Sequence, residues 1–81
     1  MYKIKTTNSF DKDFKTCVKR KYNIELLRET MKLLENTGNL DLKYKAHKLS
    51  GTYEGLWECH IKSDWLLIWK QDDIEMNITF I

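Results

Sequence analysis

Apolar residues recur at helical spacing in two consecutive segments of the N-terminal half. The first begins after Ser9, a suitable N-cap residue, and ends at Lys19-Arg20-Lys21, whose cations suit the C-terminal end of a helix. The second lies between Asn23, another N-cap residue, and Gly38, which suits the left-handed position after a helix. The apolar positions are Phe10, Phe14, Cys17 and Val18, then Ile24, Leu27, Met31 and Leu34. The pattern predicts a two-helix hairpin.

Short alternating runs predict four strands around this hairpin. They cover residues 2–6 before it and residues 53–61, 65–70 and 74–81 after it. Lys62-Ser63 and Gln71-Asp72-Asp73 are short enough to be hairpin turns, so the last three strands form an antiparallel meander. Residues 39–51 look irregular. The expected fold class is α+β, a small antiparallel sheet with a helical hairpin, and the first strand lies at an edge or beside the last.

Alternation divides the side chains between two faces of the sheet. If Lys62-Ser63 is the turn, His60 lies opposite Trp65 and Glu58 lies opposite Leu67. One face is then apolar and suits the helices; in the last strand it carries Ile74, Met76, Ile78 and Phe80. The other face carries Glu58, His60, Trp65 and Thr79. This partly aromatic, partly ionisable face is the candidate site.

Length and charge narrow the class of protein. Eighty-one residues without proline or a low-complexity linker predict one domain, residues 1–81. No apolar run reaches the roughly 20 residues of a membrane span, and no signal peptide is visible, so we expect a cytoplasmic protein. The two cysteines have no metal-ligand spacing and are expected to be free thiols. The net charge is +6 over residues 1–48 and −4 over residues 49–81, which suggests an anionic partner or a solvated lysine-rich surface.

Both histidines fall within the segment 46–65, close to candidate acids and cations. His47 is flanked by Lys43, Lys45 and Lys48, where it could meet a phosphate and act as a base, or be an ordinary loop histidine. His60 shares a strand face with Glu58, either as a catalytic pair or as a polar pair on a solvated sheet. This spacing matches no metal-ligand pattern, so neither a metal nor a cofactor is expected.

Two further residues of this segment have both functional and ordinary interpretations. Asp64 could belong to the site or simply sit in a turn. Trp65 is the tryptophan that falls on the mixed face, where it could stack on an unpaired base. Trp57 and Trp69 are expected in the core.

The order of elements and a two-block motif resemble the YafQ-like branch of the RelE toxin superfamily. The family pattern is His-x-Leu-x-Gly, followed by an acid-x-His strand and an Asp-Trp turn. This chain matches it at His47, Leu49, Gly51, Glu58, His60, Asp64, Trp65 and Trp69. The resemblance spans essentially the whole chain.

The resemblance implies a toxin of a type II toxin–antitoxin system that cuts ribosome-bound mRNA without a metal. His47 and His60 would be the acid–base and phosphate-contacting histidines, with Asp64 and Glu58 as associated carboxylates. Lys43, Lys45 and Lys48 would contact mRNA or ribosomal RNA. A cognate antitoxin would hold the toxin silent, and their complex would bind operator DNA through the antitoxin. The alternatives are a ParE-like gyrase inhibitor and a non-catalytic module that binds antitoxin and aids repression.

The chain departs from the family pattern at its C-terminal end. Family members continue with an Arg-x-Gly-Ser/Thr-His-x-Asp/Glu-Leu-Phe tail that carries a further catalytic histidine and an arginine, whereas this sequence reads Thr79-Phe80-Ile81 there. We therefore expect strongly reduced or absent cleavage by residues 1–81, with the fold and antitoxin binding retained.

Overall fold

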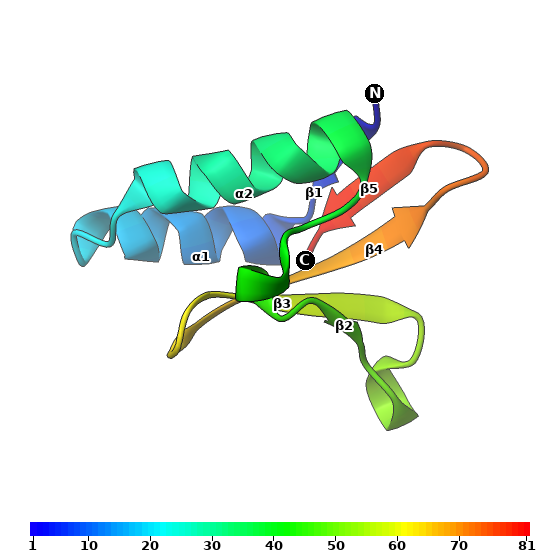
Figure 1. Ribbon diagram of the computed structural model, residues 1–81. Helices are drawn as coiled ribbons and strands as arrows, with labels where there is room; N and C mark the ends of the chain where they lie inside the picture. The colour runs from blue at the N-terminus through cyan, green and yellow to red at the C-terminus, as the bar shows by residue number, and fades with distance from the viewer.

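The computed structural model describes residues 1–81 as a five-stranded sheet with two helices on one face (Figure 1). The strands are β1 (Lys3–Thr6), β2 (His47–Lys48), β3 (Leu56–Lys62), β4 (Trp65–Asp72) and β5 (Asn77–Phe80). The helices are α1 (Asn8–Lys19) and α2 (Ile24–Thr37), with 3₁₀ turns η1 (Leu42–Tyr44) and η2 (Gly51–Tyr53). The strand order is β1-β5-β4-β3-β2. The predicted helical hairpin and α+β class are confirmed.

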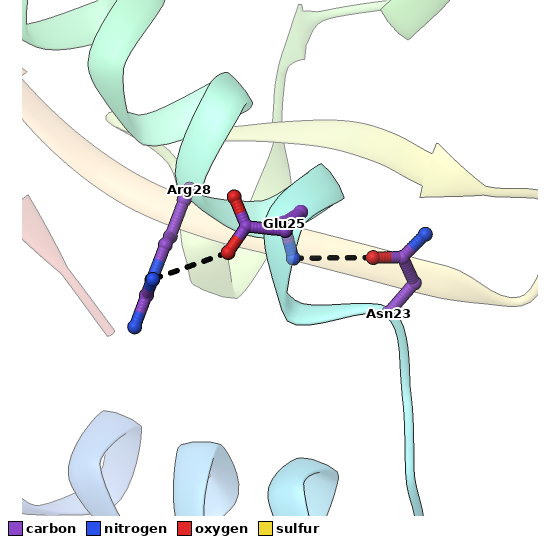
Figure 2. Close-up of polar contacts among 3 residues, drawn as sticks. All are labelled: Asn23, Glu25 and Arg28. Atoms are coloured by element: carbon purple, nitrogen blue, oxygen red, sulfur yellow. Dashed lines mark hydrogen bonds and ion pairs between the residues drawn. The ribbon is translucent and has the colours of Figure 1, made fainter.

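Capping side chains set the ends of the two helices. The side chain of Asn23 accepts a 3.2 Å hydrogen bond from the Glu25 amide at the start of α2 (Figure 2), as its N-cap role predicts. Gly38 ends α2 with φ 71°, also as predicted. At α1 the N-cap is Thr7, whose hydroxyl accepts from the Phe10 amide at 3.1 Å, and not Ser9. Thr7 and Ser9 are both suitable caps, so composition alone could not choose between them.

The first strand occupies one edge of the sheet, next to the last strand. β1 pairs with β5 in parallel, so the sheet is mixed and not antiparallel throughout. The location agrees with the prediction. Its direction could not be predicted, because the chain between β1 and β5 contains both helices and the whole meander and is long enough for either orientation.

The β3–β4 hairpin differs from the predicted register by one residue. Ser63 and Asp64 form the turn, Lys62 lies opposite Trp65, and the pairing shifts between His60 and Lys62. His60 therefore lies opposite Leu66, and Glu58 lies opposite Ile68. A one-residue slip exchanges the two faces of a strand, so β4 presents Trp65, Leu67 and Trp69 to the helices.

The last strand begins three residues later than predicted. The Asp72 carboxylate accepts hydrogen bonds from the amides of Ile74 and Glu75, which fold this segment into a turn. Ile74 is 92% exposed, and its predicted place in the core is wrong. Met76, with φ 57°, also lies in the turn and is 38% exposed, whereas Ile78 and Phe80 are fully buried as predicted.

The core lies between the helices and one face of the sheet. Its buried apolar residues are Phe10, Leu27, Leu34, Tyr44, Cys59, Trp65, Leu67, Trp69, Ile78 and Phe80. Both cysteines are free, and burial raises the pKa of the Cys59 thiol to about 12, which keeps it protonated. Neither helix has the length and apolar character needed to span a membrane.

Candidate active site

The open face of the sheet, opposite the helices, brings both histidines and a carboxylate together. His47 in β2 lies opposite Glu58 in β3, and Nε2 of His47 is 3.3 Å from Oε1 of Glu58. The rings of His47 and His60 have centroids 6.5 Å apart. Alternation along β3 places His60 on the same face as Glu58. The predicted grouping of these three residues agrees with this geometry.

Two contacts hold the ring of His47, one at each nitrogen. Its Nδ1 lies 2.9 Å from the carbonyl oxygen of Lys45, and a carbonyl can only accept, so Nδ1 carries a proton. Nε2 faces the Glu58 carboxylate, which can accept a hydrogen bond from this nitrogen. The geometry therefore suits a ring that can donate a proton from Nε2, whereas the lysine-rich sequence suggests a base.

Lys70 is a residue of this face that the sequence analysis did not identify. It lies opposite Leu56 on one side and Thr79 on the other, and therefore shares the face of Glu58 and His60. The remaining β4 residues on this face are Leu66, Ile68 and Asp72. The predicted register puts Trp69 on the face of Glu58 and His60, whereas the observed register puts Lys70 there. A correct prediction of the β3–β4 register would therefore have identified Lys70.

Trp65 is not on the open face, which corrects the prediction that it could stack on a base there. It is 9% exposed and packs edge-on against Tyr22, with ring centroids 4.9 Å apart. The cause is the register of the hairpin, because moving the turn to Ser63-Asp64 turns this side chain towards the helices.

The three predicted lysines have different surroundings. Lys43 lies over the Tyr44 ring at 5.3 Å, and Lys48 lies over the Trp57 ring at 5.5 Å. Trp57 stacks on Trp69 and so belongs to the helix-facing side of the sheet. Lys45 adopts the left-handed conformation with φ 52° and supplies the carbonyl that holds His47. Lys45 contributes to this site through its backbone carbonyl.

Asp64 lies in the β3–β4 turn and forms no hydrogen bond or ion pair with either histidine. Asp64 lines a hollow of about 380 Å³ together with residues of the α1–α2 joint. No three His, Cys, Asp or Glu side chains are grouped so that they could hold a metal ion. The groups gathered on the open face can donate and accept protons next to a cation.

Comparison with known proteins gives a consistent set of relatives. Residues 2–81 match the family model described as bacterial toxin of type II toxin-antitoxin system, YafQ. The mRNA interferase toxin YafQ of Escherichia coli K12 is 37% identical over 71 residues, which cover 86% of this chain and 77% of that protein. The crystal structure of YafQ from E. coli BL21(DE3) superposes with a TM-score of 0.89 at 33% identity, covering 99% of this chain and 88% of that one. The toxin chain of the E. coli DinJ-YafQ toxin-antitoxin complex has a TM-score of 0.87 at 34% identity, covering 98% and 86%.

Proposed function

Since the chain belongs to the YafQ family of bacterial toxins of type II toxin–antitoxin systems, we propose that it is an mRNA endoribonuclease whose active site is the open face of the sheet. The observation that carries this proposal is the pairing of His47 with Glu58 next to His60 on a face that no helix covers. These groups supply a proton donor, its counter-charge and a proton acceptor within one nucleotide's reach.

The two histidines would divide acid and base catalysis between them. His60 makes no hydrogen bond or ion pair with another residue, so a neutral ring can accept the proton of the ribose 2′-OH. The 2′-oxygen then attacks the adjacent phosphorus and the bond from phosphorus to the 5′-oxygen breaks. His47 would donate its Nε2 proton to that oxygen, which takes the place of Glu58 as the partner of Nε2, while the Lys45 carbonyl holds the ring at Nδ1. The products are a 2′,3′-cyclic phosphate and a 5′-hydroxyl.

Cations would stabilise the negative charge that develops on the phosphorus oxygens. Lys70 is an exposed cation on the face of Glu58 and His60, in the strand next to β3, and we include it among the phosphate contacts. Lys43, Lys45 and Lys48 remain proposed contacts to RNA at longer range, where their effect would weaken with salt. Asp64 remains a proposed site residue without a contact to the histidines.

Partners and location follow from the family. The E. coli relative forms a complex with the antitoxin DinJ, and we propose that a cognate antitoxin binds this chain and carries the complex to operator DNA. Ribosome-bound mRNA as the target implies a cytoplasmic protein.

An in vitro translation assay with cleavage mapped by primer extension tests this function. It compares residues 1–81 with a form extended by the family's Arg-x-Gly-Ser-His-x-Glu-Leu-Phe tail, because the resemblance implies further catalytic groups there. In the cleaving form, His60→Ala and His47→Ala are each expected to lower the rate by about 100-fold or more, since each removes a proton-transfer group.

Ile74→Ala is the matched control for this assay. Ile74 is 92% exposed in the β4–β5 turn, so its truncation is expected to leave the rate unchanged. The proposal fails if the extended form leaves mRNA uncut but blocks supercoiling by gyrase, which is the ParE-like activity.

A further inference from the structure

A hollow of about 380 Å³ lies where the α1–α2 joint meets the β3–β4 turn. Both segments lie at the same end of the molecule in Figure 1, the joint in cyan and the turn in yellow. The lining residues are Lys21, Tyr22, Asn23, Lys62, Asp64 and Trp65. We call this space the joint hollow. Two cations, two aromatic rings and one carboxylate are an unusual lining for a space that merely separates two loops.

Lys21 occupies a backbone position where glycine would be more stable. The amide of Lys21 donates to the carbonyl of Val18, and the amide of Tyr22 donates to the carbonyl of Cys17. These two bonds form a Schellman motif, whose left-handed residue is usually glycine. Lys21 adopts it with φ 59°. Lys21 therefore occupies this position at a cost in backbone strain, and its side chain lines the joint hollow.

The charges of the joint hollow are not neutralised by ion pairs. Neither Lys21 nor Lys62 forms a salt bridge, because the ion pairs of the chain are Arg28–Glu25 and His47–Glu58. Asp64 is the single carboxylate in the lining. Two lysines with one carboxylate leave the space positive overall, which favours an anionic ligand.

The aromatic wall of the joint hollow offers a stacking surface. Tyr22 packs edge-on against Trp65, with the ring planes at 86°. Tyr22 is 38% exposed and Trp65 is 9% exposed, so the tyrosine ring is the accessible one and the tryptophan fixes its orientation. An exposed ring in the same hollow as two lysines combines the two features by which proteins bind single-stranded nucleic acid, a stacking surface and positive charge.

The joint hollow is adjacent to the proposed active site. Lys62 follows His60 by two residues in β3, a separation of roughly 7 Å along a strand. The strand pairing is irregular between His60 and Lys62, so the two side chains have different surroundings. An RNA strand that reaches His60 and passes around the β3–β4 turn would place a neighbouring nucleotide at the joint hollow, whose Trp65 wall lies on the helix side of the sheet.

We propose that the joint hollow is a subsite for a single-stranded RNA nucleotide next to the scissile bond. Lys21 and Lys62 contact its phosphate, and its unpaired base stacks on Tyr22. This subsite rests on the proposed ribonuclease function. An acidic peptide of a protein partner would also be attracted by the lysines, but it would leave the stacking surface without a role.

Binding of a short fluorescein-labelled 2′-O-methyl RNA tests the subsite, because this RNA cannot undergo 2′-OH attack. Anisotropy is measured over a series of salt concentrations. Lys21→Gly, Lys21→Gln and Lys62→Gln are each expected to reduce the slope of log K against log salt by about 0.7, the value for one phosphate contact on a single strand. Tyr22→Leu is expected to weaken binding about fivefold or more with an unchanged slope.

The Lys21→Gly variant separates a functional role from a structural one. Relief of the left-handed strain is expected to raise its Tm by about 4 °C while RNA binding weakens. Met76→Gly is the matched control, because Met76 also has positive φ but lies in the β4–β5 turn. It should gain stability and bind RNA like the unaltered chain.

Two results would overturn the subsite. One is RNA affinity and salt slope unchanged in Lys21→Gly and Lys62→Gln. The other is weaker binding of a poly-glutamate peptide by these variants with RNA binding intact, which would assign the hollow to an acidic protein partner. The subsite and the proposed function can fail separately. If only the proposed function is wrong, the unaltered chain still binds this RNA through Lys21, but no form of the chain cuts mRNA.

Discussion

At the residue scale, the role of His47 depends on a single backbone contact. The carbonyl of Lys45 fixes the proton on Nδ1, which leaves Nε2 as the nitrogen that would exchange a proton with substrate in the proposed mechanism. Lys45 is in the left-handed conformation, so this contact belongs to a local backbone bend that the sequence does not reveal. The sequence could identify the histidine but not which of its nitrogens reacts.

This tautomer can be tested by NMR. Long-range ¹H–¹⁵N correlation spectra are expected to show a proton on Nδ1 of His47, because its acceptor is a backbone carbonyl. Glu58→Gln is the control, since it changes the partner of Nε2 and should leave the Nδ1 proton in place. A neutral His47 with its proton on Nε2 would contradict the assignment of this ring as the acid.

At the element scale, the end of α2 is held against the N-terminal segment. A Cβ added at Gly38 would lie 2.6 Å from the Tyr2 ring. The Tyr2 hydroxyl donates a 2.6 Å hydrogen bond to Asp73, and this bond is the main reason that the pKa of Asp73 is lowered. Gln71 donates both to Asp73 and to the carbonyl of Gly38. The helix end, β1 and the β4–β5 turn are thereby connected.

Gly38→Ala is expected to destabilise the protein by roughly 2 kcal/mol or more, because it adds a clash with Tyr2 to the cost of a left-handed alanine. Gly51→Ala is the matched control. Gly51 has φ 70° but open space around it, so only the backbone cost of about 1 kcal/mol remains. Urea unfolding measures both values. Equal losses would show that Tyr2 moves aside freely.

The element scale also shows where sequence patterns decide the structure. Asn23 and Gly38 were sufficient to place the ends of α2, because capping is local chemistry. The β3–β4 register depends on which two residues form the turn, and neither Lys-Ser nor Ser-Asp is a preferred turn sequence. The pattern therefore could not place Trp65, whose face depends on that register.

At the scale of the whole molecule, the sheet assembles the candidate site from three neighbouring strands, β2, β3 and β4. His47 comes from a two-residue strand at the edge, in a segment that looks irregular in sequence. Its pairing with β3 places it beside Glu58, a contact that alternation within β3 could not predict. The family motif identified these residues, whereas Lys70 and the joint hollow depend on tertiary structure.

The chemistry of the cut ends tests the central claim most directly. The mRNA fragments produced in the translation assay are analysed for their terminal groups. Attack by the ribose 2′-OH, with His60 as base and His47 as acid, predicts a 2′,3′-cyclic phosphate or the derived phosphate on the upstream fragment and a 5′-hydroxyl on the downstream fragment. A 3′-hydroxyl and a 5′-phosphate would contradict it, because those ends require attack by water.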